Sequence, residues 1–562
     1  MSILSPSLRR QIPIAIALHA VGFLVLYPIG TVFWLTFAGG STVSGTIPWQ
    51  EAFNTPGLVT SILNTLKVVA ATQIIALPIA LVIAWLLART DLPGARWIEF
   101  GFWVLFFLPS MGVMTGWLLC FDPDFGLANR WLSAIGLDRF AGFDLYSFGG
   151  IVFIHVATYG IAVKVMLLTP AFRNLDASIE EASALCGANR IKTLLRIVLP
   201  IMTPAILVVV LMSIIRGFET FEVELILGTP IRFQVFSTKI YQLMHNSPPE
   251  FRAAGTLGTS ILAIILPLIV LQRWASTRRS FTTVTGRIAR GKAKLGAWRW
   301  PACIALIGVV AFFSLLPFGL LVMGSFMTMF GFFDVAEVWT IAQWSKAFED
   351  TTLLSSLSNT LYLGIGTALL ATIVYVAVAY CIVRPKSRLR APLDFLTWLP
   401  FTVPGIILGF GYLNMALRVP IFSPLYGTIG ALILVSILSA MPLGVQVLKN
   451  HMMQVGAEIE EAGRVAGASW MQGFRRILLP LASPTLAIVA IMVFASTIRG
   501  VSNLMLLSSG SNRVLAVLQV EYLSEGNFGP AAVIGTMIVL MSLVAAVIVR
   551  LVSLRYEIAS RS

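Results

Sequence analysis

The chain consists of long apolar runs that are separated by short polar segments. Each run is at least as long as the ~20 residues that a helix needs to cross the hydrocarbon core of a bilayer. Apolar sequence without strict alternation predicts helices rather than the strands of a membrane barrel. We therefore expect an all-α integral membrane protein with about twelve transmembrane helices, at residues 11–37, 58–88, 98–120, 148–169, 202–228, 254–274, 300–328, 354–383, 393–417, 425–448, 482–507 and 530–554.

Composition supports this prediction. Of the 562 residues, 57% are hydrophobic and 11% are charged, and the mean hydropathy is +0.89. Soluble domains carry roughly 25% charged residues, so a soluble globular fold is excluded. The first run, 11–37, is longer than the roughly 7–15-residue core of a signal peptide, which predicts a retained first span. The four cysteines and four histidines are scattered, so neither a metal site nor a disulfide framework is expected.

The basic residues indicate the orientation of the chain. Lys and Arg number 39 against 25 Asp and Glu, which gives a net charge of +14. In a membrane protein such an excess marks the cytoplasmic loops, so we expect no nucleic-acid partner. The connector 272–300 holds eight Lys and Arg without an acid, and the loop 384–394 holds four against Asp394. Both fall on the same side as the two termini, which predicts cytoplasmic N- and C-termini.

One polar segment occurs twice. Residues 180–200 read EEASALCGANRIKTLLRIVLP, and residues 460–480 read EEAGRVAGASWMQGFRRILLP. Other short motifs repeat at similar offsets, which indicates a duplicated module with insertions in its loops. These motifs are Trp49-x-x-Ala52-Phe53 with Trp344-x-x-Ala347-Phe348, Asn64-Thr65-Leu66 with Asn359-Thr360-Leu361, Arg89 with Arg384, Leu108-Pro109 with Leu399-Pro400, and Ile215-Arg216-Gly217 with Ile498-Arg499-Gly500.

The repeat divides the chain into two modules. Each half has six predicted spans and begins on the same side of the membrane, so the repeat is parallel, whereas inverted repeats begin on opposite sides. We expect a first module at residues 1–285, a basic cytoplasmic linker at 286–299 and a second module at 300–562.

Each copy of the polar segment lies between the fourth and fifth spans of its module. In the first copy, Ser178 with Glu181 three residues later predicts a capping box at the start of a short helix. Gly187 predicts the left-handed end of that helix, and a second short helix leads to Leu199-Pro200. The second copy needs a different cap, because Glu458 replaces Ser178. Small residues let another surface approach the helix backbone closely, which predicts docking on a partner.

The spacing E-A-x-x-x-x-G, nine residues and I-x-L-P resembles the cytoplasmic loop of binding-protein-dependent ABC importer permeases. The resemblance implies a type I ABC importer-like fold in which loops 174–200 and 454–480 dock on two copies of a cytoplasmic ABC ATPase subunit. The chain departs from the family pattern at the second alanine, which is Ser183 in one copy and Gly463 in the other. The implied coupling residues are Glu181, Ala182, Gly187, Leu199 and Pro200 in the first loop, and Glu461, Ala462, Gly467, Leu479 and Pro480 in the second.

The chain itself shows no nucleotide-binding motif. Residues 286–293, GRIARGKA, have nearly the spacing of a phosphate-binding loop. Ala293, however, lacks the hydroxyl that such a loop offers to Mg²⁺, and no strand precedes it. We therefore expect that the chain is not an enzyme and binds no cofactor, and that ATP and Mg²⁺ are held by the partner ATPase.

The fifth span carries ionisable residues within an apolar run. Arg216, Glu219 and Glu222 recur at every third residue, which predicts one helical face. Such groups cost about 2.5–3.5 kcal/mol each when they face lipid, so they should line a cavity or pair with one another. A lining of the solute path and an Arg–Glu brace without a solute role both remain open. The candidates for the path are Arg216, Glu219, Glu222, Arg499 and Asn503, with His155 and Lys164 of the fourth span as secondary ones.

Residues 218–256 resemble the fused two-module permeases of the iron(III)-transport type, including Pro249, Ala253 and Ala254 at the start of the last span. This implies a permease of the bacterial inner membrane that takes iron(III) from a periplasmic solute-binding protein. Thiamine, phosphonate and polyamine importers resemble it too. A proton-coupled secondary carrier with parallel halves is the alternative of another class, although it gives the doubled loop no role. A membrane enzyme would need clustered catalytic groups, which the sequence lacks.

Overall fold

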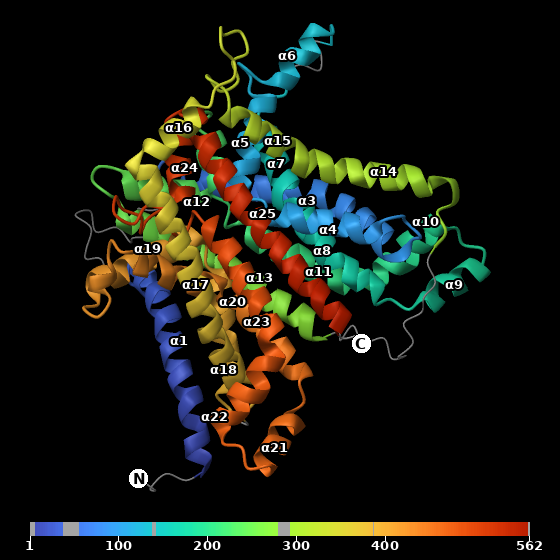
Figure 1. The fold of residues 1–562 in the computed structure, drawn as a ribbon, viewed down its shortest axis with the longest axis vertical. Coiled ribbons are helices and arrows are strands. Elements are labelled where there is room, and N and C mark those ends of the chain that lie inside the picture. Colours follow the sequence, from blue (N-terminus) through green and yellow to red (C-terminus); the bar gives the residue numbers. More distant parts are fainter. Residues whose placement is uncertain (1–5, 38–54, 138–141, 279–292, 386, 560–562) are drawn as a thin grey trace.

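The computed structural model describes residues 6–37, 55–137, 142–278, 293–385 and 387–559 (Figure 1). Within these ranges the chain is almost entirely helical, and the only β-pairing is two isolated bridges, Thr90 with Ala293 and Met327 with Trp339. The motif Trp49-x-x-Ala52-Phe53 and residues 286–292 of the predicted linker lie outside the described residues.

The helices of the two halves follow one another in a similar order of long and short elements. Those before residue 279 are α1 (Pro6–Phe37), α3 (Leu58–Arg89), α4 (Ala95–Phe107), α5 (Ser110–Phe121), α6 (Leu127–Ala134), α7 (Phe148–His155), α8 (Ala162–Arg173), α9 (Ala177–Leu185), α10 (Arg190–Thr193), α11 (Leu199–Gly217), α12 (Phe236–His245) and α13 (Phe251–Arg278). Those after residue 292 are α14 (Arg299–Val310), α15 (Leu316–Ser325), α16 (Ala342–Glu349), α17 (Thr351–Val383), α18 (Arg390–Trp398), α19 (Gly405–Arg418), α20 (Ile429–Gln454), α21 (Ala457–Val465), α22 (Trp470–Gly473), α23 (Leu479–Ile498), α24 (Leu515–Ser524) and α25 (Phe528–Ala559).

The prediction of an all-α membrane fold with about twelve spans is confirmed. In the described part of the chain, nine helices are long and apolar enough to cross a membrane. Three further spans consist of two helices each, which meet at 96° between α4 and α5, at 41° between the helices of 148–173, and at 109° between those of 390–418. Counting each bent pair as one span gives twelve, each of which overlaps a predicted span. The fifth and eleventh spans end at Gly217 and Ile498, before the predicted ends at 228 and 507.

Proline breaks the third span of each module. Leu108 and Val403 are extended, with ψ of 135° and 120°, and each precedes a proline, at 109 and 404, that caps the next helix. Proline disfavours a helical residue before it and lacks the amide hydrogen that a continuing helix needs. The structural counterpart of Pro109 is therefore Pro404, and the sequence alignment of Leu108-Pro109 with Leu399-Pro400 is wrong by four residues.

The first span of each module packs on the third span of the other module. α1 contacts α18 and α19, while α14 contacts α4 and α15 contacts α5. The closest approaches are equivalent: a Cβ atom on Gly116 would lie 2.0 Å from the carbonyl oxygen of Pro317, and one on Gly411 would lie 2.6 Å from that of Pro28. Only glycine allows backbones this close, so the two modules are joined by a reciprocal exchange of their first spans.

Figure 1 shows the result as two diverging arms. One arm holds α17, α20 and α23 together with α1, and it ends at α21 and α22. The other holds α3, α4, α8 and α11 together with α14, and it ends at α9 and α10. Each repeated polar segment thus lies at the far end of one arm.

We expect Gly116→Ala to weaken the contact between the modules. The added methyl group would overlap the Pro317 carbonyl, and overpacking of this kind costs about 1–3 kcal/mol. The thermal unfolding temperature of the detergent-solubilised protein should fall. Gly308→Ala is the matched control, because nothing lies within 4 Å of a Cβ atom there, and it should leave that temperature unchanged or raise it. Equal behaviour of the two variants would contradict the close approach.

Candidate functional site

The two copies of the polar segment have the same structure at a constant offset of 280 residues. α9 corresponds to α21, and α10 corresponds to α22. A π-helical turn follows in both copies, at Leu194–Val198 and Phe474–Leu478, and runs directly into α11 or α23. The matched residues therefore occupy matched places, and we call residues 174–200 and 454–480 the first and second coupling segments.

The starts of the short helices differ from the predicted caps. α9 begins at Ala177, so Ser178 already lies inside it, and the backbone amide of Ser178 donates to Asp176 Oδ1 at 2.9 Å. The predicted capping box of Ser178 with Glu181 is therefore wrong, since Asp176 caps the helix. A capping box does occur at α22, where Ser469 and Gln472 exchange side-chain-to-backbone hydrogen bonds of 2.8 and 3.3 Å.

Gly187 and Gly467 end α9 and α21 in the left-handed conformation, with φ of +78° and +86°. The next amide in each copy donates to the carbonyl five residues earlier, from Ala188 to Ser183 and from Ala468 to Gly463, at 3.1 and 3.0 Å. This is the Schellman arrangement, in which a positive φ is needed and glycine is favoured. Nothing lies within 4 Å of a Cβ atom at either glycine, so each is required by the turn rather than by packing.

The small residues at the departure from the family pattern pack inside each segment. Ser183 is buried and its hydroxyl bonds to that of Thr193 at 2.8 Å. A Cβ atom on Gly463 would lie 2.8 Å from the side chain of Ile477. Position 183 thus contacts the second short helix, α10, and position 463 packs against the π-helical turn that follows α22.

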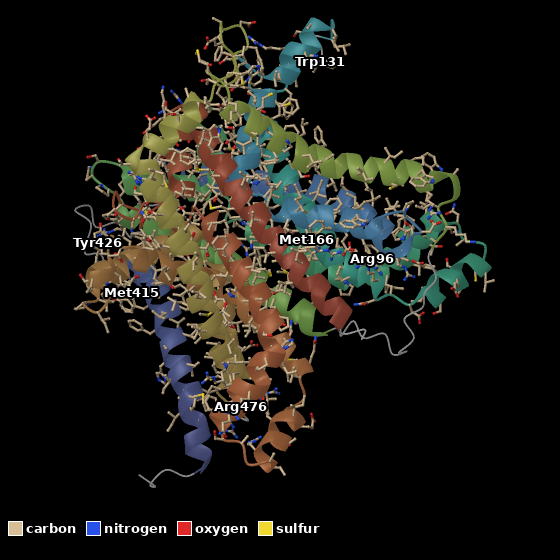
Figure 2. The ribbon with its side chains drawn as sticks, viewed as in Figure 1. Arg96, Trp131, Met166, Met415, Tyr426 and Arg476 are labelled. Carbon is tan, nitrogen blue, oxygen red and sulfur yellow. The ribbon has the colours of Figure 1, made fainter. Side chains whose placement is uncertain are left out.

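The opposite face of each segment is exposed. The predicted coupling residues Glu181, Ala182, Glu461 and Ala462 all face solvent. Leu185 and Val465, which are equivalent, are each 91% exposed. Leu199 and Leu479 are half-buried, whereas Pro200 and Pro480 are exposed. A charged and apolar surface at the tip of each arm is therefore uncovered in this chain. Figure 2 places Arg476, beside α22, at one of these tips and Trp131, on the projecting α6, at the other end of the molecule.

An arginine ties each coupling segment to the second span of its module. Arg89, the last residue of α3, donates from Nε and Nη2 to the carboxylate of Glu180 at 3.2 and 3.0 Å, and from Nη1 to the Leu175 carbonyl at 3.0 Å. Arg384 pairs with Glu460 at 2.6 Å and donates to the Val455 carbonyl at 3.1 Å. Both arginine side chains are nearly buried, at 4% and 12% exposure. These pairs are shielded from solvent and so are stronger than ordinary surface ion pairs.

A second group of polar residues gathers where the third spans break. The guanidinium of Arg216 lies 4.4 Å from the ring of Phe401, at the break of the second module. The equivalent Arg499 lies 5.3 Å from the ring of Phe106, at the break of the first module, and donates to the Phe106 carbonyl at 2.6 Å. Each arginine thus reaches across to the other module, and Arg499 satisfies a carbonyl at the end of α4 that has no helical partner.

The prediction that Arg216, Glu219 and Glu222 share one helical face is wrong. α11 ends at Gly217, and residues 218–221 are not helical. The hydroxyl of Thr220 donates back to the Gly217 carbonyl at 3.1 Å, which competes with helix continuation. Arg216 and Glu219 nevertheless pair at 2.8 Å, as a brace would require. Glu222 instead accepts a 2.9 Å hydrogen bond from Ser110, the first residue of α5, where the positive helix terminus favours a carboxylate.

The sequence analysis missed Glu224. Its side chain is completely buried, and its Oε1 lies 2.7 Å from His155 Nε2, within hydrogen-bonding distance. The sequence does show a glutamate inside an apolar run. Its partner His155, however, lies 69 residues away, so sequence pattern alone does not reveal the pair. Lys164, the other secondary candidate, is buried and donates to the Gly160 carbonyl at 2.9 Å. Asn503 donates to Ser439 at 3.1 Å, and among the described residues no three His, Cys, Asp or Glu side chains come together as metal ligands.

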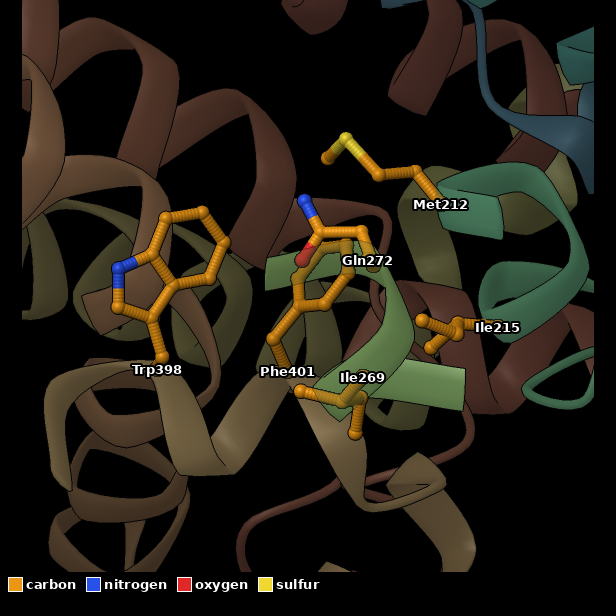
Figure 3. Close-up of a pocket in the computed structure, with 6 residues that line it drawn as sticks. All are labelled: Met212, Ile215, Ile269, Gln272, Trp398 and Phe401. Atoms are coloured by element: carbon orange, nitrogen blue, oxygen red, sulfur yellow. The ribbon is translucent and has the colours of Figure 1, made fainter. Parts of the chain in front are cut away.

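A small hollow opens beside Phe401 between the modules (Figure 3). Its walls are Met212 and Ile215 of α11, Ile269 and Gln272 of α13, and Trp398 and Phe401 of the second module. Its volume is about 10 Å³, far below the ~300–1,000 Å³ that is typical of small-molecule sites. It is mostly apolar and lies next to the Arg216 contact.

Known proteins resemble this chain in sequence. Residues 374–558 match the family model described as "Binding-protein-dependent transport system inner membrane component". This part of the chain is a permease domain of that family. The match begins within α17 and covers the second coupling segment, so the observed α21–α22 geometry belongs to a family domain.

Curated relatives extend the similarity to most of the chain. The ferric transport system permease protein FbpB of Actinobacillus pleuropneumoniae is 27% identical over 72% of this chain and 59% of its own length. A putative ferric transport system permease protein, FbpB 1, of Haemophilus influenzae is 28% identical over 66% of this chain and 58% of its own. The molybdate/tungstate permease protein WtpB of Thermococcus kodakarensis is 27% identical over 36% of this chain and 81% of its own. The chain thus spans less than two thirds of the length of the two ferric relatives.

The buried pair of His155 and Glu224 yields a prediction about the stability of this protein. Breaking a buried pair by removing one partner costs about 3–5 kcal/mol, whereas replacing both with apolar residues is often neutral. His155→Leu should therefore lower the thermal unfolding temperature strongly. The double variant with Glu224→Leu should recover most of the loss. Additive losses in the double variant would show that the two side chains do not stabilise each other.

Proposed function

We propose that this chain is the membrane subunit of an ATP-driven importer of the binding-protein-dependent class. The observation that carries the proposal is the pair of exposed coupling segments, which have equal structure and lie at the ends of the two arms. A partner that binds both coupling segments must itself present two equivalent binding sites. Two copies of a cytoplasmic ABC ATPase subunit meet this requirement, with ATP and Mg²⁺ bound on those subunits.

Each coupling segment offers a partner two kinds of contact. The exposed Glu181 and Glu461 provide charge, and the protruding Leu185 and Val465 provide apolar surface. Apolar side chains exposed to this extent are typical of interaction sites when they cluster. This composition supports docking into a groove with basic and apolar walls. In this proposal the coupling segments and both termini lie on the cytoplasmic side of the bacterial inner membrane, as the excess of Lys and Arg in the loops on that side favours.

The polar residues at the third-span breaks are the proposed path for the solute. Arg216 with Glu219, and Arg499 with Asn503, lie on the two modules near the breaks, and Glu222 joins them from the first module. Broken helices at membrane depth are tolerated where they are buried in protein or line a cavity, and they form solute sites in many transporters. Arg216 and Glu219 are paired. In this proposal the same pair both braces the break and lines the solute path.

Iron(III), delivered by a periplasmic solute-binding protein, is the proposed solute. This proposal rests on the names of the ferric relatives and on the resemblance of residues 218–256. The charges near the breaks include both arginines and glutamates, so they favour neither a cation nor an anion by themselves. Thiamine, phosphonate and polyamine remain alternatives within the same importer class.

Substitution of the turn glycines tests the proposed coupling. In Gly187→Val or Gly467→Val, a β-branched residue would have to adopt a positive φ, which costs about 1–2 kcal/mol or more. The turn should reshape, and ATP-dependent uptake of radioactive iron(III) into proteoliposomes that contain the co-purified ATPase and binding protein should be lost. The amount of protein in the membrane should not change.

The control is Gly473→Ala, because nothing lies within 4 Å of a Cβ atom at Gly473 and its φ is negative, at −61°. This variant should transport normally. Full uptake by both valine variants would contradict the coupling role. Uptake that needs no ATPase and collapses with an uncoupler would favour the proton-coupled carrier instead.

A further inference from the structure

The second span of each module carries repeated residues that the proposed coupling and path leave unexplained. Asn64 and Thr65 lie near the start of α3, and Arg89 is its last residue. Asn359, Thr360 and Arg384 repeat them 295 residues later. Asn359 and Thr360 lie near the start of α17, and Arg384 directly follows its last residue. The arginine at one end holds the coupling segment, as described above, so the question is what the Asn-Thr pair holds at the other.

The Asn-Thr pair of the first module holds the beginning of α12. Asn64 Nδ2 donates to the Gln234 carbonyl at 3.0 Å, and Thr65 Oγ1 accepts from the backbone amide of Phe236 at 2.9 Å. Phe236 is the first residue of α12, where amide groups lack a helical acceptor. Val235, the residue before it, has no side-chain oxygen to serve as a cap. Thr65 therefore supplies from α3 the acceptor that α12 lacks.

The second module repeats the arrangement at α24. Asn359 Nδ2 donates to the carbonyls of Arg513 and Ser511 at 2.9 and 3.2 Å. Thr360 Oγ1 accepts from the backbone amide of Leu515, the first residue of α24, at 2.8 Å. The residue before α24 is again a valine. All four Asn and Thr side chains are buried, so these bonds are protected from competing water.

A continuous helix joins the two ends. α3 and α17 have 32 and 33 residues, and at 1.5 Å per residue Asn64 and Arg89 are roughly 37 Å apart along the axis. A helix transmits axial displacement with little extension, because its backbone hydrogen bonds fix its length. α3 stays one helix through Pro78, where one of these bonds is absent. Both of its ends are anchored by bonds to segments that are distant in sequence.

The start of α12, which Asn64 and Thr65 anchor, in turn contacts the proposed solute path. The hydroxyl of Ser237, in the first turn of α12, donates to the Thr220 carbonyl. Thr220 follows Glu219 directly, and Glu219 pairs with Arg216. A displacement of α12 therefore acts on the residues beside Arg216 through one hydrogen bond.

From these contacts we propose that α3 and α17 are struts, and that Arg89, Asn64, Thr65 and their equivalents are positioning residues. Each strut carries a displacement of its coupling segment to the start of α12 or α24 on the other side of the membrane. This inference rests on the proposed function, since it assumes that an ATPase moves the coupling segments.

Site-specific labels can follow the two ends of the first strut separately. Cys186 lies in the first coupling segment and is exposed, whereas Cys120, Cys303 and Cys381 are buried. A nitroxide on Cys186 thus reports the cytoplasmic end. Ile231→Cys in a Cys186→Ser background reports the outer end, because Ile231 is 40% exposed and lies just before the anchored residues. Both spectra are recorded for the complex with its ATPase, with and without a non-hydrolysable ATP analogue.

In the parent complex both labels should respond to the nucleotide analogue. In Arg89→Gln the label at 186 should still respond, while the response at 231 should fall to less than a fifth. The charge exchange Arg89→Glu with Glu180→Arg should restore it. The control is Arg173→Gln, because Arg173 lies directly before the first coupling segment but its side chain pairs with Glu99 of α4 instead of with a carboxylate of that segment. That variant should behave like the parent.

The outcomes distinguish failure of the proposed strut from failure of the proposed coupling. A full response at 231 in Arg89→Gln would overturn the strut. If that variant does not accumulate, Thr65→Val breaks the outer end alone, and it should leave the response at 186 intact while it removes the response at 231. An undiminished response at 231 in Thr65→Val would also overturn the strut. If neither label responds in the parent complex, the proposed coupling fails rather than the strut.

Discussion

A backbone group without a hydrogen-bond partner costs several kcal/mol in hydrocarbon. At the breaks at Pro109 and Pro404, backbone groups inside the spans lose their helical partners. At the first break, the Phe106 carbonyl is satisfied by Arg499 from the other module, and Glu222 lies at the positive start of α5 through Ser110. The break is therefore stabilised by opposite charges at its two helix ends. Because one of them comes from the second module, the polar centre exists only while the modules are assembled.

The reciprocal packing of the first spans serves the same requirement. Gly116 and Gly411 allow the backbones of opposite modules to approach closely at Pro317 and Pro28, and both glycines lie in the helices that follow the breaks. Each broken third span therefore packs against the first span of the opposite module. Arg216 or Arg499 of that opposite module contacts it nearby. The coupling segments show the opposite design, since their exposed faces are attached to the arms mainly through α10, α22 and the buried arginine pairs. A rigid centre with accessible tips is consistent with the proposed driving of this protein by a separate ATPase.

Sequence reasoning recovered the features that depend on local pattern. Hydropathy located all twelve spans, and the glycine positions located the left-handed ends at Gly187 and Gly467. It failed where the deciding partner is distant or where several residues compete for one role. Asp176 and Ser178 both fit a helix cap, and only the backbone decides between them. Glu224 is explained by a histidine 69 residues away, and the contact of Arg499 with Phe106 spans 393 residues. The true counterpart of Pro109 was hidden because Leu-Pro occurs again just before Pro404.

Some functional residues occur at equivalent positions in both modules, whereas others occur in only one of them. The turn glycines, the arginine clamps, the Asn-Thr anchors and the arginine–phenylalanine contacts occur in both. The carboxylates Glu219, Glu222 and Glu224 occur only in the first, and the corresponding region of the second holds Ser502 and Asn503. In the proposed importer, two equal ATPase subunits would act on the two modules, and residues that transmit their motion would have to be the same in both. A solute that passes between the modules would place no such demand on the residues that it meets. The proposal therefore assigns the shared residues to coupling and the unequal ones to the solute path.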